Sequence, residues 1–281
     1  MTQPTTQDVA THYETTGLLD RIVTALAQSG KDIDALTIDD LADVDEFHSR
    51  RRRATEELAR MLAPQATDHV IDVGCGLGGP ARYLAATCGC RVSGVDLTPE
   101  FVAAATGLTQ LTGLMDRVDL RQGSALDLPF PDGGFDLAWS QNVAMNIADR
   151  PRYYAEMRRV LKPGGRLAIQ DVAQGPGGEV AYPVMWADRP GISFLRTPEE
   201  TRELLEAAGF RVTQWIDNTE AALLEAEAER LQAPSAPQAG PPALGIHLIV
   251  GPSAREKMRN MQRNQQEKRT LLINAVLERV G

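Results

Sequence analysis

The sequence has few cysteines and few histidines. Three cysteines and four histidines occur among its 281 residues. Cys88 and Cys90 are too close in sequence for an easy disulfide, and no histidine or further cysteine gathers around the thiols. We therefore predict reduced, structural cysteines and no metal site.

The sequence also lacks a long hydrophobic run. No stretch reaches the about 18 to 20 continuous apolar residues of a membrane-spanning helix. Residues 1–8 are polar and lack the basic and then apolar arrangement of a secretory signal. We expect a cytoplasmic protein without a membrane partner.

Basic charge is scarce as well. The formal net charge of −9 would repel a phosphate backbone, so no nucleic-acid partner is expected. The one dense basic run, residues 50–53, consists of four arginines. We interpret it as a solvated helix face, with recognition of phosphate or carboxylate as the alternative.

Hydrophobic residues make up 43% of the chain, which is enough for a sizeable core. Residues 1–62 lack strand patterning and predict helices over 9–29 and 44–62. From residue 69 onwards, short β-branched runs alternate with helical stretches, which predicts a parallel sheet covered by helices on both faces. The predicted strands are 69–73, 91–96, 118–122, 135–140, 166–171 and 211–216. The predicted helices are 80–88, 99–112, 151–161, 198–208, 219–231 and 253–268.

The strongest functional signal is the glycine-rich segment 71–79, which follows the first predicted strand. Gly74, Gly76 and Gly78 have no Cβ, so the backbone there can turn sharply and approach a ligand closely. Asp96 ends the next predicted strand, where a carboxylate can accept hydrogen bonds from both hydroxyls of an adenosine ribose. The alternatives are a tight turn without a ligand for the glycines and a cap of the following helix for Asp96.

Two further segments place polar groups at the same edge of the predicted sheet. The loop 122–130 contains Ser124, whose hydroxyl and neighbouring backbone amides can lie beside an adenine. The segment 135–142 ends a predicted strand with Gln141 and Asn142.

In this order, and with the Leu-Lys-Pro-Gly-Gly-Arg-Leu segment at 161–167, these motifs resemble the class I S-adenosylmethionine-dependent methyltransferases over about residues 44–216. Within that family the sequence is most similar to small-molecule N-methyltransferases of the sarcosine and dimethylglycine type, followed by sugar O-methyltransferases of natural-product pathways. The resemblance implies S-adenosyl-L-methionine as the cofactor and a small molecule of secondary or osmolyte metabolism as the substrate. Methylation of nitrogen, oxygen or carbon stays open.

The resemblance also implies the fold. It predicts an α/β, doubly wound, seven-stranded Rossmann-like sheet, with an N-terminal helical lid over 1–62 and the methyltransferase domain over 63–281. Periodicity alone fits 270–279 to a helix or a strand; the resemblance makes it the last strand, antiparallel and preceded by a helical insertion. Substrate-cap segments are expected at 173–197 and 219–268. The oligomeric state is open, a homodimer included.

The cofactor-binding residues follow from the resemblance in three groups: the glycine segment around the methionine part, the end of the second strand at the ribose, and the 122–130 loop at the adenine. Gln141 matches a position near the sulfonium, and Tyr13 matches an aromatic residue that closes over the cofactor. The implied set is Tyr13, Asp72, Gly74, Gly76, Gly78, Asp96, Leu97, Ser124, Ala125 and Gln141.

The catalytic demand is modest, because methyl transfer displaces an already activated sulfonium and needs mainly alignment and exclusion of water. A hydroxyl or an acidic carbon gains from a base, whereas an unprotonated amine or a carboxylate needs none. Many relatives have histidine at position 146, which is asparagine here, so no histidine base is expected from that loop. The candidate catalytic residues are His247, His48 and Tyr13, and the candidate substrate-binding residues are Phe47, Asn146, Trp186, Arg196 and His247.

Each candidate has a structural alternative. Trp186 and Phe47 also fit core positions, and a lone histidine such as His48 or His247 also fits a structural role. Two other functions remain as alternatives: a catalytically silent cofactor-binding or scaffold protein, and a nicotinamide-dependent oxidoreductase. The second fits poorly because Asp72 stands two residues before the first glycine of the turn.

Overall fold

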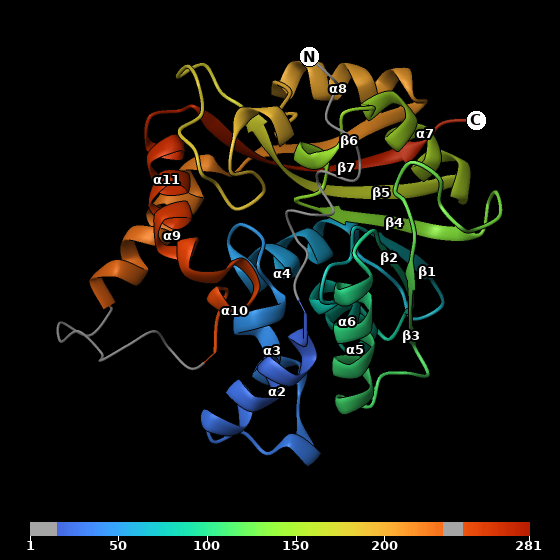
Figure 1. The fold of residues 1–281 in the computed structure, drawn as a ribbon. Helices are drawn as coiled ribbons and strands as arrows, with labels where there is room; N and C mark the ends of the chain where they lie inside the picture. Colours follow the sequence, from blue (N-terminus) through green and yellow to red (C-terminus); the bar gives the residue numbers. More distant parts are fainter. Residues whose placement is uncertain (1–15, 233–243) are drawn as a thin grey trace.

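A computed structural model describes residues 16–232 and 244–281 of the chain. In this part a seven-stranded sheet has the order β3-β2-β1-β4-β5-β7-β6 (Figure 1). The strands are β1 (His69–Val73), β2 (Arg91–Asp96), β3 (Val118–Gln122), β4 (Phe135–Gln141), β5 (Leu161–Gln174), β6 (Phe210–Asp217) and β7 (Thr270–Arg279). Neighbouring strands pair in parallel except β7, which is antiparallel to both β5 and β6. The predicted fold class is therefore confirmed.

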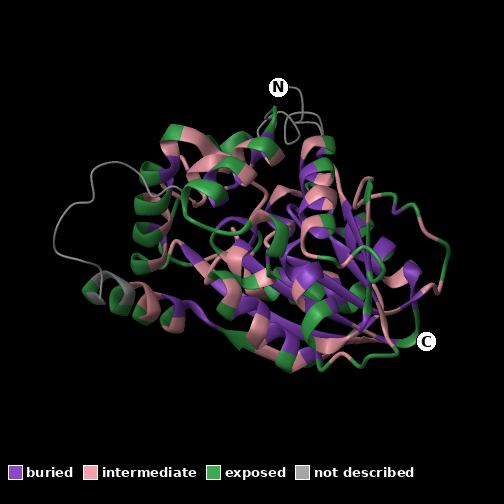
Figure 2. Ribbon diagram, turned by 90° about the horizontal axis from the view of Figure 1, so that it is seen from below, coloured by how far each residue is buried: buried purple, intermediate pink, exposed green. Residues whose placement is uncertain are grey.

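Helices cover both faces of this sheet. Figure 1 shows α4 (Arg51–Leu62), α5 (Gly79–Cys88) and α6 (Pro99–Leu111) on one face, and α7 (Arg150–Val160) and α8 (Pro198–Ala207) on the other. In β1, Val70 packs with residues of α4 and α5, whereas Ile71 and Val73 pack with residues of α7. Strands buried on both faces are mostly apolar, and in β1 Val70, Ile71 and Val73 are buried, with Asp72 as the one buried acidic residue. Figure 2 shows the buried residues concentrated in the strands and on the inward faces of these helices.

The segment 270–279 is a strand, although its periodicity fitted a helix equally well. β7 lies between β5 and β6 and pairs with both, for example through Gln170 and Ile216 on either side of Asn274. Val276 packs on the α4 side, while Ala275 and Leu277 pack on the α7 side. Because both faces are covered, the apolar residues do not alternate, and only the pairing distinguishes strand from helix.

The prediction of one helix over 44–62 is wrong. The chain forms α3 (Ile38–Asp45), which starts at a capping box of Thr37 and Asp40, and then α4. Arg50, which precedes α4, and Arg51, its first residue, have φ of 65° and 46°. Left-handed residues cannot continue a right-handed helix, so the chain turns there and residues 46–50 form a loop. Of the helix predicted over 9–29, α2 (Leu18–Gln28) is observed, and residues 9–15 lie outside the described part.

The arginine run is not a uniformly solvated helix face. Arg51 and Arg53 are more than half exposed, at 54% and 63% of the side chain. Arg50 forms ion pairs with Glu57 at 2.7 Å and with Glu225 at 2.8 Å, and its side chain is largely buried. The left-handed turn directs Arg50 away from the helix surface. Its role is therefore the binding of carboxylates within the protein, rather than that of a solvated residue.

The insertion between β6 and β7 contains α9 (Thr219–Gln232), α10 (His247–Val250) and α11 (Ala254–Gln266). Together with α3 these helices lie at one end of the sheet (Figure 1). Leu248 and Ile249 pack against the cluster that α2, α3 and α6 form. The N-terminal helices and the insertion therefore meet over the same edge of the sheet. None of the described helices combines the length and apolar character needed to cross a membrane.

Candidate active site

A cavity of about 1450 Å³ lies beside the glycine-rich turn and the ends of β2 and β4. Its walls come from the 46–51 loop, the 141–149 loop, the 185–194 segment and α11. Sites for one small molecule usually measure about 300–1000 Å³. This cavity is therefore large enough for a cofactor and a second molecule together.

The glycine-rich turn is shaped by close packing. Gly74 and Gly76 have φ of 78° and 52°, and a Cβ on Gly74 would lie 2.3 Å from the Val143 side chain. Gly74 and Cys75 both donate their amide hydrogens to the Val95 carbonyl, which ties the turn to β2. The glycines therefore form the tight turn that was the alternative interpretation. Gly74 and Gly76 also line the cavity, as a role in ligand binding requires. Gly78, with φ of 76°, is the N-cap of α5 and does not line the cavity, so the structure does not support its predicted contact with the cofactor.

Asp96 holds this turn in place. One carboxylate oxygen accepts a hydrogen bond from the amide of Gly76 and the other accepts one from the amide of Thr98, both at 2.9 Å. Burial raises the pKa of Asp96, although these two hydrogen bonds oppose the rise. Asp96 lines the cavity as well as accepting a hydrogen bond from Thr98 at the start of α6. The helix-cap role and the predicted contact with a ribose are therefore compatible.

We expect Asp96→Ala to weaken S-adenosylmethionine binding by about 10- to 150-fold, which is the scale of about 1.5 to 3 kcal/mol for a hydrogen bond to a charged group. Calorimetric titration of the variant would measure this. Asp96→Asn is the matched control, because asparagine keeps a side-chain acceptor for one of the two amides. Unchanged affinity in a folded Asp96→Ala protein would mean that the ribose lies elsewhere.

Asp72 is a buried carboxyl group on the cavity wall. Burial and the neighbouring carboxylates of Asp96 and Glu46 raise the pKa of Asp72 to about 8. One of its oxygens has no hydrogen-bond partner among the described residues. A buried carboxyl of this kind fits a positively charged ligand group, such as the ammonium of the cofactor's methionine part.

Gln141 is fixed in the wall by a buried network. Its side-chain oxygen accepts hydrogen bonds from Trp139 at 2.9 Å and Thr55 at 3.3 Å, and its amide nitrogen donates to Gln170 at 3.0 Å. The polar atoms of Gln141 are therefore engaged within the protein, and the side chain offers the cavity a rigid surface. The predicted adenine and ribose residues Leu97, Ser124 and Ala125 also line the cavity.

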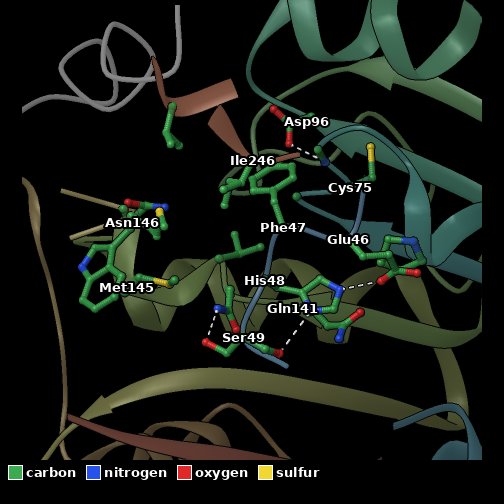
Figure 3. Close-up of a pocket in the computed structure, with 18 of the residues that line it drawn as sticks. Glu46, Phe47, His48, Ser49, Cys75, Asp96, Gln141, Met145, Asn146 and Ile246 are labelled. Atoms are coloured by element: carbon green, nitrogen blue, oxygen red, sulfur yellow. Dashed lines mark hydrogen bonds and ion pairs between the residues drawn. The ribbon is translucent and has the colours of Figure 1, made fainter. Parts of the chain in front are cut away.

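His48 lies beside a buried carboxylate. Its Nε2 is 2.8 Å from Glu46, and Glu46 also accepts a hydrogen bond from Thr55 at 2.6 Å and pairs with Arg52 at 2.6 Å. Burial alone would favour the neutral acid, but His48, Arg52 and Thr55 together lower the pKa of Glu46. The ionised carboxylate holds the imidazole on the cavity wall, and Figure 3 shows the ring close to Gln141.

The other predicted residues differ in their placement. Phe47, Asn146 and Trp186 line the cavity, and Figure 3 places Phe47 between Asp96 and His48. The Phe47 ring lies 3.1 Å from the position that a Cβ on Gly76 would take, so it covers the glycine-rich turn. The Trp186 indole is buried and donates a hydrogen bond to Ser193 at 2.9 Å.

His247 and Arg196 are absent from the cavity wall. On α10 it is Ile246 and Val250, four residues apart, that line the cavity, so His247 is directed elsewhere. Arg196 is half exposed and lies 3.9 Å from Glu200. This structure does not support their predicted contact with the substrate. Tyr13 lies outside the described residues.

Sequence reasoning missed Glu46, the partner of His48. An acidic residue two positions before a candidate base was visible in the sequence, but a predicted helix over 44–62 would have separated the two side chains. The loop at 46–50 brings them together instead.

We expect methyl transfer to be undiminished by EDTA. Within the described residues, 16–232 and 244–281, no group of three or more His, Cys, Asp or Glu side chains is placed to hold a metal ion. Initial rates before and after treatment with EDTA would test this. A loss of activity that Mg²⁺ restores would contradict it.

Comparison with known proteins agrees with this geometry. The sequence family described as a methyltransferase domain matches residues 71–169, which run from β1 into β5. The O-methyltransferase resE of Aspergillus sclerotiorum is 30% identical over 76% of this chain and 80% of that protein. The sarcosine/dimethylglycine N-methyltransferase of Halorhodospira halochloris is 32% identical over 69% of this chain and 70% of that protein. The match spans 66% of the length of the methyltransferase GfsG of Streptomyces halstedii. It spans 36% of the length of a probable tocopherol O-methyltransferase of Oryza sativa subsp. japonica.

Among solved structures, the [4+2]-cyclase SpnF is 25% identical, with a TM-score of 0.66 over 100% of this chain and 99% of that one. Similarity to a protein described as a cyclase shows the shared fold rather than a shared reaction. The two curated relatives are both described as methyltransferases, which disfavours an oxidoreductase and a silent scaffold. The chain belongs to the class I S-adenosylmethionine-dependent methyltransferases that act on small molecules.

Proposed function

We propose that this enzyme methylates a hydroxyl oxygen of a largely apolar small molecule, with His48 as the general base. The observation that carries this proposal is the pair of His48 and Glu46 on the cavity wall (Figure 3). A hydroxyl must lose its proton as its oxygen attacks, whereas an amine can arrive unprotonated and a carboxylate carries no proton. A base held by a buried carboxylate is therefore most useful for a hydroxyl.

The shape of the pair suggests which atom accepts the proton. Nε2 of His48 faces Glu46, which leaves Nδ1 to take the proton. The carbonyl oxygen of Ser49 lies 3.3 Å from Nδ1 and can accept a hydrogen bond once that nitrogen is protonated. When bound, the cofactor supplies an activated methyl carbon on its sulfonium. The task of the chain is then to align the hydroxyl with that carbon and to exclude water.

The lining supports an apolar acceptor. Met145, Met185, Trp186 and Phe194 form a hydrophobic wall away from the glycine-rich turn. Methionine side chains adapt to ligands of irregular shape, because they are unbranched and have three rotatable bonds. The name of the relative resE, an O-methyltransferase, also favours oxygen. The sarcosine/dimethylglycine relative makes N-methylation the second candidate.

We also propose that the division between lid and catalytic domain lies before α4. The predicted boundary at residue 62 assigns α4 to the lid, but α4 contacts β5 and β7 and belongs to the helical layer on the sheet. The 43–50 segment and residues of α9, α10 and α11 border the cavity. Arg50 joins these two parts through Glu225.

Matched acceptors that differ in the nucleophile would test the proposed reaction. We expect transfer to 4-butylphenol to exceed transfer to 4-butylaniline, with labelled S-adenosylmethionine and mass spectrometry of the products as the measurement. 4-Butylbenzoate serves as the carboxylate comparison. Methylation of the aniline alone would contradict the proposal and favour N-methylation.

A further inference from the structure

One face of α11 lines the cavity. Of the segments that line it, α11 is the most C-terminal in the sequence. The residues of α11 that face the cavity lie mainly three and four positions apart, as one face of a helix requires. They are Arg255, Met258, Arg259, Met261, Gln262 and Gln265.

The opposite face of α11 holds the helix in this orientation. Lys257 is buried and forms an ion pair with Asp188 at 2.9 Å. The Asn264 side chain is also buried, and it accepts a hydrogen bond from the Ala181 amide at 2.8 Å and donates one to the Ala181 carbonyl at 3.0 Å. Rotation of α11 would break these contacts, so its arginine-bearing face, which is exposed to solvent, stays on the cavity side.

Arg255 and Arg259 are one helical turn apart on that face. Neither has a carboxylate within 4 Å among the residues that the structure describes, whereas Arg50 and Arg51, which also line the cavity, both form ion pairs with carboxylates. Two like charges at this spacing repel each other. An anion bound between them would remove the repulsion and accept hydrogen bonds from both guanidinium groups.

The cavity lining contains both acidic and basic side chains, Asp149, Glu225, Arg50 and Arg51 among them. The carboxyl groups of Glu46, Asp72 and Asp96 lie at the end formed by the glycine-rich turn, which suits a cationic cofactor. Arg255 and Arg259 come from α11, which Figure 1 shows at the other side of the molecule from β1 and β2. The apolar wall of methionine and tryptophan side chains belongs to the same cavity.

We propose that the methyl acceptor carries an anionic group, such as a carboxylate, which Arg255 and Arg259 bind at the α11 end of the cavity. The acceptor is then an apolar molecule with an anion at one end and the reacting group toward His48; the position of the reacting group rests on the proposed function. Arg255 and Arg259 determine specificity and take no part in the proton transfer.

Octanoate and octan-1-ol, which share one chain length and differ in charge, are suitable probes. We expect the protein saturated with S-adenosylhomocysteine to bind octanoate about tenfold more tightly than octan-1-ol in calorimetric titrations. The double variant Arg255→Gln/Arg259→Gln should lose about tenfold in octanoate affinity and change octan-1-ol affinity less than about twofold. Arg255→Lys/Arg259→Lys should keep part of the preference, because the charge remains.

Arg263→Gln is the matched control, since Arg263 lies on the same helix, is exposed, and pairs with Glu267 at 2.8 Å outside the cavity. It should bind both probes as the unchanged protein does. Equal affinity for the two probes, no octanoate binding, or an equal loss in Arg263→Gln would each overturn the proposal. The assay measures binding without transfer, so a failure of His48 as the base would leave its result unaffected.

Discussion

Asp72→Asn should stabilise the cofactor-free protein at alkaline pH and, at the same time, weaken its binding of S-adenosylmethionine. Asp72 is buried, and its pKa in the folded protein is about 8, against about 3.9 in an unfolded chain. Between these values the folded state binds a proton that the unfolded state has released, so the free energy of unfolding falls as pH rises. Above pH 8 the folded protein carries the full cost of a buried charge, which asparagine avoids.

Thermal unfolding at several pH values would measure the first effect. At about pH 9 we expect the variant to exceed the unchanged protein by at least about 1 kcal/mol, or about 2–4 °C in Tm. The difference should shrink toward about pH 4, where the unchanged Asp72 stays protonated in the folded state. Asp119→Asn, which removes a half-exposed carboxylate paired with Arg121 on β3, should show no such trend.

Cofactor binding should move in the opposite direction. An ionised Asp72 is expected to hold the ammonium of the methionine part, so its loss should cost about 10- to 100-fold in affinity. Below pH 8 the unchanged protein should gain affinity as pH rises, approaching about tenfold per pH unit, because binding selects the ionised carboxylate. A variant that binds the cofactor as tightly as the unchanged protein, with the same pH dependence, would show that Asp72 is a purely structural residue.

His48→Asn should lower kcat by about 10²- to 10⁴-fold, the usual contribution of a positioned general base. Asparagine keeps a polar side chain of similar reach but cannot take the proton from an attacking hydroxyl. The affinity for S-adenosylmethionine should stay within about twofold, because the cofactor contacts are assigned to Asp72, the glycine-rich turn, Asp96 and the 124–125 loop. Single-turnover rates with a hydroxyl acceptor would separate the chemical step from binding.

Glu46→Gln is the matched variant for the His48 experiment. Glutamine keeps an acceptor near Nε2 but removes the charge that holds the imidazole, so kcat should fall less than in His48→Asn and the acidic limb of the pH–rate profile should move. An increase in KM with unchanged kcat in His48→Asn would mean that His48 only binds the acceptor. That outcome would favour N-methylation, for which no base is required.

Local sequence patterns were sufficient for β1 to β6 and for the glycine-rich end of the cavity, whereas β7 needed the family resemblance. The β1 and β2 runs, the glycine turn between Gly74 and Gly78, and Asp96 at the end of β2 are close in sequence and follow from backbone chemistry that any chain obeys. Parallel strands place their carboxyl ends at one edge, so these residues meet without further information.

Long-range packing decided the acceptor end. The break at Arg50 depends on carboxylates of α4 and α9, and Glu225 is distant in sequence from that loop. The same packing turned Ile246 and Val250 toward the cavity in place of His247, which helical periodicity over a four-residue helix could not predict.

By itself the sequence determined the fold class and the class of cofactor. The physical reason is that the patterns of strand-forming residues and the glycine-rich turn are set within short stretches of chain. Only the tertiary structure brought Glu46 to His48 and placed the exposed Arg255 and Arg259 at the edge of the cavity. Those placements depend on a turn and on the orientation of a helix, which are set by contacts between residues far apart in the chain.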